Sequence, residues 1–224
     1  MFHLDAGEFT FRAAGPEDAP FIAQAVAAAE SSGTHVFSYA RIFGVDDETM
    51  KSFLTQIAQE DAPGQDLTHN NYLIVEFRGK PVAACAGWVE AFNCAPSAHL
   101  KMQLFGHFLP PEIVAGAKAR LEKVAQVHIE RTPGALQLES FYVLPEFRGK
   151  NLPHKLINEH IKRFKLVFPD LKIAQIVLMR ENTQALKSYL KAGFEIVAET
   201  RSDDPEIPQL LSGTGKYLLQ LQIG

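Results

Sequence analysis

The segment 135–179 constrains the fold most, because its pattern indicates a strand, a helix and a second strand in direct succession. "ALQLESFYV" has the apolar and aromatic residues of a strand, and apolar residues at helical spacing follow from Pro153 to Phe168. "KIAQIVLM" is a short, continuous apolar run, which is typical of a buried strand. Two strands joined by one helix pair in parallel through a crossover, so we expect a parallel strand pair in this chain.

The remaining patterns place antiparallel strands around this pair. "FTFRAA" predicts a first strand, and "NYLIVEFRGKPVAACAGWVE" predicts a hairpin around an Arg-Gly-Lys turn at 78–80. "EIVAET" and "GKYLLQLQI" predict two final strands. Helices are expected near 15–30, 46–59 and 181–194, where apolar residues recur at helical spacing. We therefore expect a single α/β domain over residues 1–224, in which helices cover both faces of one mixed sheet.

The composition narrows the range of partners. The formal net charge is −4, so the chain lacks the basic balance that is usual in nucleic-acid binders. No stretch reaches the roughly 18 apolar residues of a membrane span, and "MFHLDAGEF" lacks the basic region that opens a secretory signal. Cys85, Cys94 and the scattered histidines form no set with metal-ligand spacing. We expect a cytoplasmic protein with no metal, no nucleic-acid partner and no membrane contact.

A second Arg-Gly-Lys turn, at 148–150, stands between the first parallel strand and the crossover helix. The start of a helix presents unpaired backbone N–H groups and the positive end of the peptide dipoles, which suits phosphate oxygens. Arg148 and Lys150 add positive charge, and Gly149 lets a ligand approach the backbone. The turn therefore predicts a phosphate or pyrophosphate site. It has neither the Gly-Lys-Ser/Thr ending of a Walker loop nor the glycine pattern of a dinucleotide fingerprint.

"SFYVLPEFRGKNLPHKLI", followed by "IVLMRENTQALKSYLKAGF", resembles the GNAT superfamily of acetyltransferases. In that family a strand ends in Val-x-Pro, a basic loop wraps the pyrophosphate of coenzyme A, and an Asn and a Tyr follow before Gly-Phe. The matching residues here are Val143, Pro145, Arg148, Asn182, Tyr189, Gly193 and Phe194. The resemblance implies a GNAT-type fold and transfer of an acetyl group from acetyl-CoA to a primary amine by direct attack.

The same resemblance implies a role for individual residues. Tyr189 would protonate the departing thiolate, and Glu139 is the candidate general base, because related enzymes often carry an acid at that place on the strand. Asn182 would lie beside the pantetheine arm. The strand residues implied to bind that arm are Phe141, Tyr142 and Val143. The loop residues implied to hold the pyrophosphate are Arg148, Gly149, Lys150, Asn151, Leu152, Pro153 and His154.

Two loop residues depart from the family pattern. Asn151 and Pro153 stand where the family has Gly and Gly or Ala, and Pro153 has no N–H to offer a phosphate. We therefore expect weaker or shifted contacts to coenzyme A, and a GNAT-like coenzyme A sensor or scaffold without activity stays open as an alternative. Structural roles also stay open for Tyr189 as a core aromatic, Asn182 as a helix cap and Glu139 as an ion-paired strand residue.

Residues 91–134 are less regular and form an insertion between the third and fourth strands. One helix is expected within it, from Pro111 to Ile129. Because it lies next to strand ends at the implied cofactor site, we expect the insertion to form a wall or lid over the acceptor, or a dimer contact. The expected partner is a small-molecule or peptide amine acceptor, and a homodimer is possible.

Overall fold

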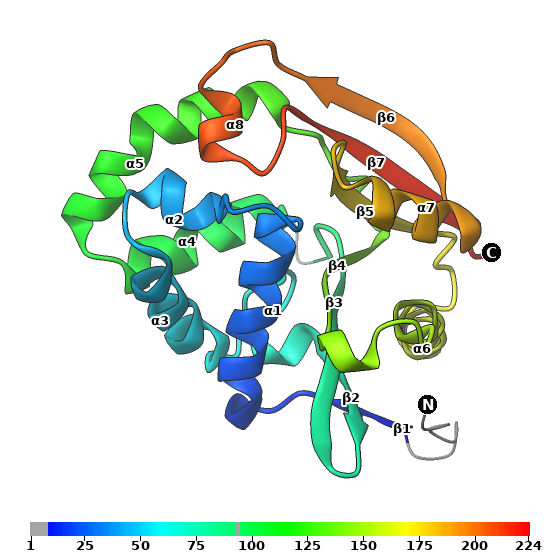
Figure 1. Ribbon diagram of the computed structural model, residues 1–224. Helices are drawn as coiled ribbons and strands as arrows, with labels where there is room; N and C mark the ends of the chain where they lie inside the picture. The colour runs from blue at the N-terminus through cyan, green and yellow to red at the C-terminus, as the bar shows by residue number, and fades with distance from the viewer. Residues whose placement is uncertain (1–8, 93–94) are drawn as a thin grey trace.

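The computed structural model describes residues 9–92 and 95–224, and these residues form one seven-stranded sheet with helices on both faces (Figure 1). The described residues do not include 1–8, to which the expectation about a secretory signal applies, and they do not include Cys94. The strands are β1 (Phe9–Ala13), β2 (Tyr72–Phe77), β3 (Lys80–Val89), β4 (Leu136–Val143), β5 (Ile173–Met179), β6 (Glu195–Arg201) and β7 (Gly215–Gln222). The α-helices are α1 (Ala19–Ser31), α2 (Ser38–Phe43), α3 (Asp47–Ala58), α4 (Ser97–Phe108), α5 (Pro111–Val124), α6 (Leu152–Val167), α7 (Thr183–Lys191) and α8 (Ile207–Leu210).

The sheet has the strand order β1-β2-β3-β4-β5-β7-β6. Its neighbouring strands are antiparallel except for β4 and β5, which are parallel and are joined through α6. The prediction of a mixed sheet with one parallel pair is therefore confirmed. The crossover helix begins at Leu152, one residue before the expected start, and Pro153 occupies its first turn, where a missing N–H costs least.

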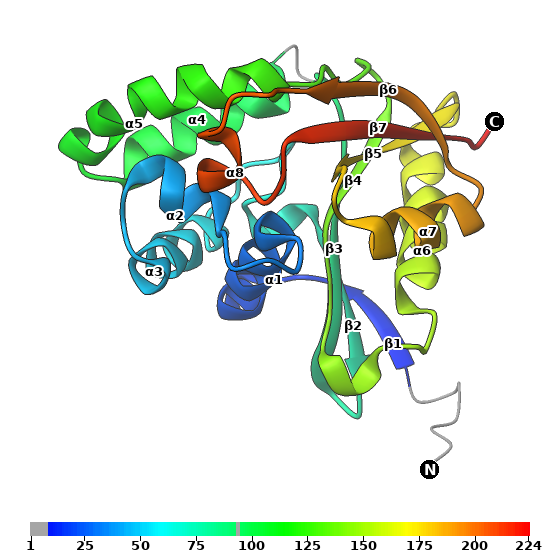
Figure 2. The ribbon, with the colours of Figure 1, turned by 45° about the horizontal axis from the view of Figure 1, so that its top comes forward.

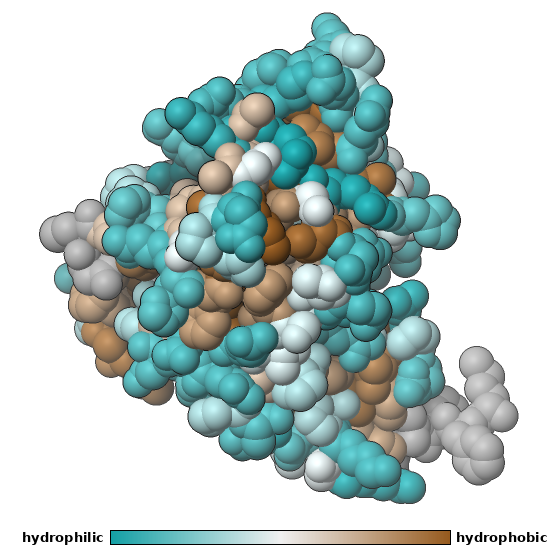
Figure 3. All heavy atoms as spheres, turned by 90° about the vertical axis from the view of Figure 1, so that its left-hand side faces the viewer, coloured by the Kyte–Doolittle hydropathy of each residue, from teal (hydrophilic) through white to brown (hydrophobic). Residues whose placement is uncertain are grey.

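Two hydrophobic cores lie on the two faces of the sheet, because alternate residues of each strand point to opposite sides. Tyr72 and Ile74 of β2 belong to the core under α1, α2, α3, α4, α5 and α8. Leu73 and Val75 belong to the core that contains residues of α6 and α7. Figures 1 and 2 show these two groups of helices on opposite sides of the sheet. The face that α5 and α2 present is largely hydrophilic, with apolar side chains gathered toward its middle (Figure 3).

Three helices were not expected from the sequence. α2 and α8 are short, and α4 precedes the one helix that was expected in the insertion. The expected helix, Pro111 to Ile129, ends earlier, at Val124, and continues as a 3₁₀ turn over Ala125–Val127. The apolar pattern of α4 is weak, since only Ser97 and Phe105 of its residues are buried, and this explains why periodicity did not find it.

No helix in the described ranges, 9–92 and 95–224, combines the length and the apolar composition that crossing a membrane would require.

Candidate active site

The two parallel strands separate shortly after they pair. β4 and β5 are registered only at Leu136 with Ala174 and at Gln137 with Gln175. The buried Gln137 side chain donates from Nε2 to Oε1 of Gln175 at 3.0 Å, at the point where pairing ends. Beyond Gln137, the edge of β4 that faces β5 has no strand partner among the described residues. The sheet therefore opens into a wedge at its centre.

A bulge in β4 lies at the mouth of this wedge. Ala86 of β3 pairs with Glu139 and Ala84 pairs with Tyr142, so three steps along β4 match two along β3. Ser140 takes up the extra residue with a left-handed φ of 52°, which is uncommon for a residue other than glycine. Its hydroxyl donates to Oδ2 of the buried Asp66 at 2.9 Å, which holds the bulge in place. Bulges of this kind redirect side chains, and here the bulge lies between Glu139 and Phe141.

The loop from Arg148 to His154 has the geometry of an anion site. Gly149 and Asn151 both have left-handed φ angles, 76° and 58°, and α6 begins directly after Asn151. Among the described residues, the amides at 149–152 and that of His154 donate no hydrogen bond. Pro153 interrupts this series of donors. The cavity described below reaches this loop, because Arg148 and Pro153 are part of its lining.

Asn182 and Tyr189 reach the same cavity from α7. Asn182 caps the helix, since its Oδ1 accepts from the Ala185 amide at 3.2 Å, while its Nδ2 has no partner in the described part of the chain. The Tyr189 ring packs against Phe141 and Phe194, with centroid separations of 5.5 and 6.1 Å. Burial raises the pKa of Tyr189, so its hydroxyl is protonated and available as a donor. Both residues thus have a structural role and a cavity-facing group.

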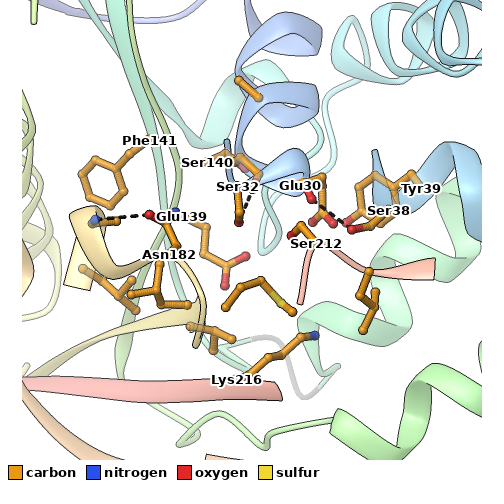
Figure 4. Close-up of a pocket in the computed structure, with 18 of the residues that line it drawn as sticks. Glu30, Ser32, Ser38, Tyr39, Glu139, Ser140, Phe141, Asn182, Ser212 and Lys216 are labelled. Atoms are coloured by element: carbon orange, nitrogen blue, oxygen red, sulfur yellow. Dashed lines mark hydrogen bonds between the residues drawn. The ribbon is translucent and has the colours of Figure 1, made fainter. Parts of the chain in front are cut away.

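A single cavity of about 660 Å³ joins these elements. Figure 4 shows Phe141 and Asn182 on one side of it, Glu30, Ser38, Tyr39 and Ser212 on the other, and Glu139 between them. Helices α4 and α5 and the segment after α5 contribute part of the wall, including Lys101, Phe105, Leu121, Val124 and Arg131. The inserted segment therefore forms part of the cavity wall, and its expected role toward an acceptor or in a dimer stays a prediction.

Two buried ion pairs line the wall of the cavity. The Lys101 ammonium lies 2.9 Å from Asp66 and 4.0 Å from Glu139. Arg131 forms an ion pair with Glu139, and the side chains of these two residues are only 14% and 13% exposed. Arg131 also donates to Oε1 of Gln137 at 3.1 Å and lies over the Trp88 ring. The candidate base is thus an ion-paired carboxylate that faces the cavity.

No family model matches the chain, and no curated protein matches it in sequence. Solved structures match it over almost its whole length. One is an acetyltransferase with 20% identity and a TM-score of 0.63, covering 96% of this chain and 100% of that chain. Another is the acetyltransferase of the GNAT family from Streptococcus pneumoniae, with 18% identity and a TM-score of 0.50, covering 97% and 100%. A third is a putative acetyltransferase from Salmonella typhimurium, solved with its cofactor acetyl-CoA, with 14% identity and a TM-score of 0.52, covering 97% and 95%.

The fold is that of the GNAT acetyltransferases. The predicted fold class is therefore confirmed, and identities of 14–20% establish the fold and not the activity. On this GNAT fold, the structure brings Glu139, Phe141, Asn182 and Tyr189 to one cavity. No group of three or more histidines, cysteines or acids that could hold a metal ion occurs in the ranges that the structure describes.

The GNAT fold also brings together charged residues that the sequence did not single out. These are Glu30 at the end of α1, Lys101 of α4, Arg131 before β4 and Lys216 of β7. Burial raises the pKa of Glu30 and lowers the pKa of Lys216. Each residue stands alone in its own element, so no spacing signal connects them.

Proposed function

We propose that this protein is an N-acetyltransferase that moves an acetyl group from acetyl-CoA to a primary amine by direct attack. The observation that carries this proposal is the wedge between β4 and β5, which opens onto one cavity that runs from the Arg148 loop to Glu139 and Tyr189. The fold likeness supports it, since the structures that match are acetyltransferases.

The residues present fit coenzyme A as the cosubstrate. The unpaired edge of β4, at Phe141 to Val143, offers backbone groups to the amides of a pantetheine arm, as an added strand would use them. The free amides at 149–152 and 154 and the positive end of α6 offer donors to a pyrophosphate. Arg148 and Lys150 add positive charge beside those amides. The free Nδ2 of Asn182 offers one more donor where the strands part.

The reaction needs an amine without its extra proton, a donor for the oxyanion and an acid for the thiolate. The thioester supplies the acyl group. Glu139 takes the proton that the amine nitrogen loses as it bonds to the acyl carbon, directly or through water. A backbone amide of β4, at Tyr142 or Val143, donates to the oxyanion. Tyr189 gives its hydroxyl proton to the sulfur when the carbon–sulfur bond breaks.

Thermal melting combined with a thiol-release assay tests this function. The purified protein is melted with acetyl-CoA, CoA, ATP and NAD at matched concentrations, because a ligand that binds only the folded state raises the midpoint. We expect a rise with acetyl-CoA and CoA and none with ATP or NAD. We also expect free thiol to appear when acetyl-CoA is mixed with an amine acceptor. If neither coenzyme A form raises the midpoint up to millimolar concentrations, the proposal is wrong.

A coenzyme A sensor or scaffold without turnover is the second candidate. Two observations favour it: Pro153 removes one donor from the loop, and the Glu139 carboxylate is already engaged by Arg131. A protein of this kind would show the same rise in melting temperature with coenzyme A. It would release no thiol with any amine, and this outcome separates the two candidates.

A further inference from the structure

One side of the cavity holds an acid and a base that have no ion-pair partner. Glu30 projects from the last turn of α1, and Lys216 from the start of β7, and both line the cavity (Figure 4). Neither forms an ion pair with a residue in the ranges that the structure describes. By contrast, two other cations of the cavity wall have acidic partners, since Lys101 pairs with Asp66 and Arg131 pairs with Glu139.

Both residues are half-buried, and a charge without a partner is costly to bury. The cost shows in both residues, because burial raises the pKa of Glu30 and lowers the pKa of Lys216, each toward the neutral form. Lys101 and Lys216 both favour the charged form of Glu30, and Glu30 favours the charged form of Lys216, so Glu30 and Lys216 lie within electrostatic reach of each other without forming an ion pair. A ligand that carries both an ammonium and a carboxylate offers each of them a partner at once.

Ser212 provides a second, independent sign of a ligand. Its side chain lines the cavity beside Glu30, the residue is only 5% exposed, and its hydroxyl has no hydrogen-bond partner among the described residues (Figure 4). A buried hydroxyl without a partner is rare in folded proteins. A carboxylate held by Lys216 would accept this hydrogen bond as well.

The position of these groups separates them from the reacting amine. The amine that is acetylated must reach the thioester, which the proposed function places by Asn182 and Tyr189. Glu30 and Ser212 lie on the opposite side of the cavity from Asn182, with Glu139 between them (Figure 4). The unpaired charges therefore face a second, unreactive end of the acceptor.

We infer that the acceptor is a diamino carboxylic acid, acetylated on its side-chain amine, whose α-ammonium binds Glu30 and whose carboxylate binds Lys216 and Ser212. This inference rests on the proposed function and names the substrate class of the same site. The side chain of the acceptor spans the cavity from these groups to the thioester.

Wild-type kinetics with a matched set of amines tests the inference without any variant. The set is lysine, cadaverine, which lacks the carboxylate, 6-aminohexanoate, which lacks the α-amine, and pentylamine, which lacks both. Ornithine, putrescine and 5-aminopentanoate repeat the test with a shorter chain. A hydrogen bond to a charged group is worth about 1.5–3 kcal/mol, so each missing group should lower kcat/KM about 10- to 100-fold.

Two variants assign the groups. We expect Lys216→Met to lower kcat/KM about 10- to 100-fold for whichever of lysine and ornithine is the better substrate. For the corresponding diamine, cadaverine or putrescine, kcat/KM should change less than about threefold. Glu30→Gln should remove the discrimination against the amino acid that lacks the α-amine. Lys118→Met is the matched control, since Lys118 is exposed on α5 and is not part of the cavity lining, and it should change neither ratio.

The outcomes distinguish this inference from the proposed function. If the wild type acetylates the diamines as well as the diamino acids, the inference is wrong while the acetyltransferase stands. If no amine is acetylated, the melting midpoint is measured with lysine or ornithine. A rise in the midpoint that Lys216→Met removes supports the amino-acid site and rejects the acetyltransferase. If neither transfer nor a rise is seen, both are rejected.

Discussion

Replacing Glu139 by Gln should weaken folding as well as catalysis, because it leaves Arg131 charged, buried and without its partner. Coulomb's law gives about 4 kcal/mol for two unit charges at about 4 Å with an effective dielectric constant of about 20. Breaking a buried ion pair by removing one partner typically costs about 3–5 kcal/mol. Both side chains are slightly exposed, at 13% and 14%, so we expect the low end, about 3 kcal/mol of the free energy of unfolding. For a chain of this size that is a fall of roughly 6–12 °C in the melting midpoint.

A double-mutant cycle measures this energy. Urea unfolding of the wild type, Glu139→Gln, Arg131→Met and the double variant gives the coupling energy between the two side chains, which we expect to be about 2–3 kcal/mol. Glu48→Gln is the matched control. Glu48 lies 2.7 Å from Lys51 but is 84% exposed, so the same substitution there should change stability by less than about 0.5 kcal/mol.

One result would refute the reasoning. If Glu139→Gln melts within about 2 °C of the wild type and the coupling energy is near zero, the Arg131 pair does not stabilise the fold. Glu139 would then be able to accept a proton without losing a stabilising ion pair. Any loss of activity in the Glu139→Gln variant could be attributed to the missing base and not to weaker folding. With the expected result, activity of the variant must be measured at a temperature where it is fully folded.

Three further predictions concern other parts of the molecule. Tyr189→Phe should lower kcat about 100-fold and leave the Kd for CoA unchanged by calorimetry, since it removes only the proton donor; an equal loss of CoA binding would contradict this. Pro153→Ala restores a backbone donor in the first turn of α6 and should lower the Kd for CoA about tenfold by calorimetry, whereas an unchanged Kd would place the pyrophosphate elsewhere. Burial alone would raise the pKa of Asp18, but hydrogen bonds from Arg12 and the Gly15 amide outweigh it and lower that pKa. The stability that ionised Asp18 adds is therefore present above the ordinary carboxyl pKa and is lost as pH falls toward its lowered pKa. The difference in unfolding free energy between wild type and Asp18→Asn should shrink from pH 7 to pH 3. A constant difference would contradict this assignment.

The half of the cavity that we propose for the cosubstrate has local signals in the sequence, so its backbone geometry could be predicted. The strand, the loop and α6 follow one another in the chain, and Pro153 and the apolar spacing fix the helix within one residue. Asn182 stands at a recognisable helix start, where it does cap α7. In the proposed function backbone amides would bind in this half, and their placement depends on the turn and on the first residues of the helix rather than on distant side chains.

The charged wall could not be predicted, because its members come from segments that are far apart in the chain. Glu30 and Lys216 are separated by most of the sequence, and each has the local pattern of a solvent-facing residue at the end of an element. Arg131 and Glu139 are only eight residues apart in the sequence. Their ion pair nevertheless could not be predicted, because the loop between them has no periodic pattern from which its path follows. The β4 bulge is equally invisible, since a serine with a left-handed φ has no sequence signal.

The insertion shows why a wall of this kind does not behave as a removable lid. Its side chains reach the cavity through Lys101 and Arg131, but Phe105 and Ala117 of the same segment are almost completely buried in the core under α1 and α2. Arg120 of α5 also donates from Nε to the Ile42 carbonyl at 2.6 Å, which ties the segment to α2. Removing the insertion would expose that core and leave Asp66 and Glu139 buried without their cations. The same segment that lines the cavity thus helps to hold one face of the sheet together, so we expect single substitutions at the cavity surface, and not deletion of the segment, to test acceptor choice.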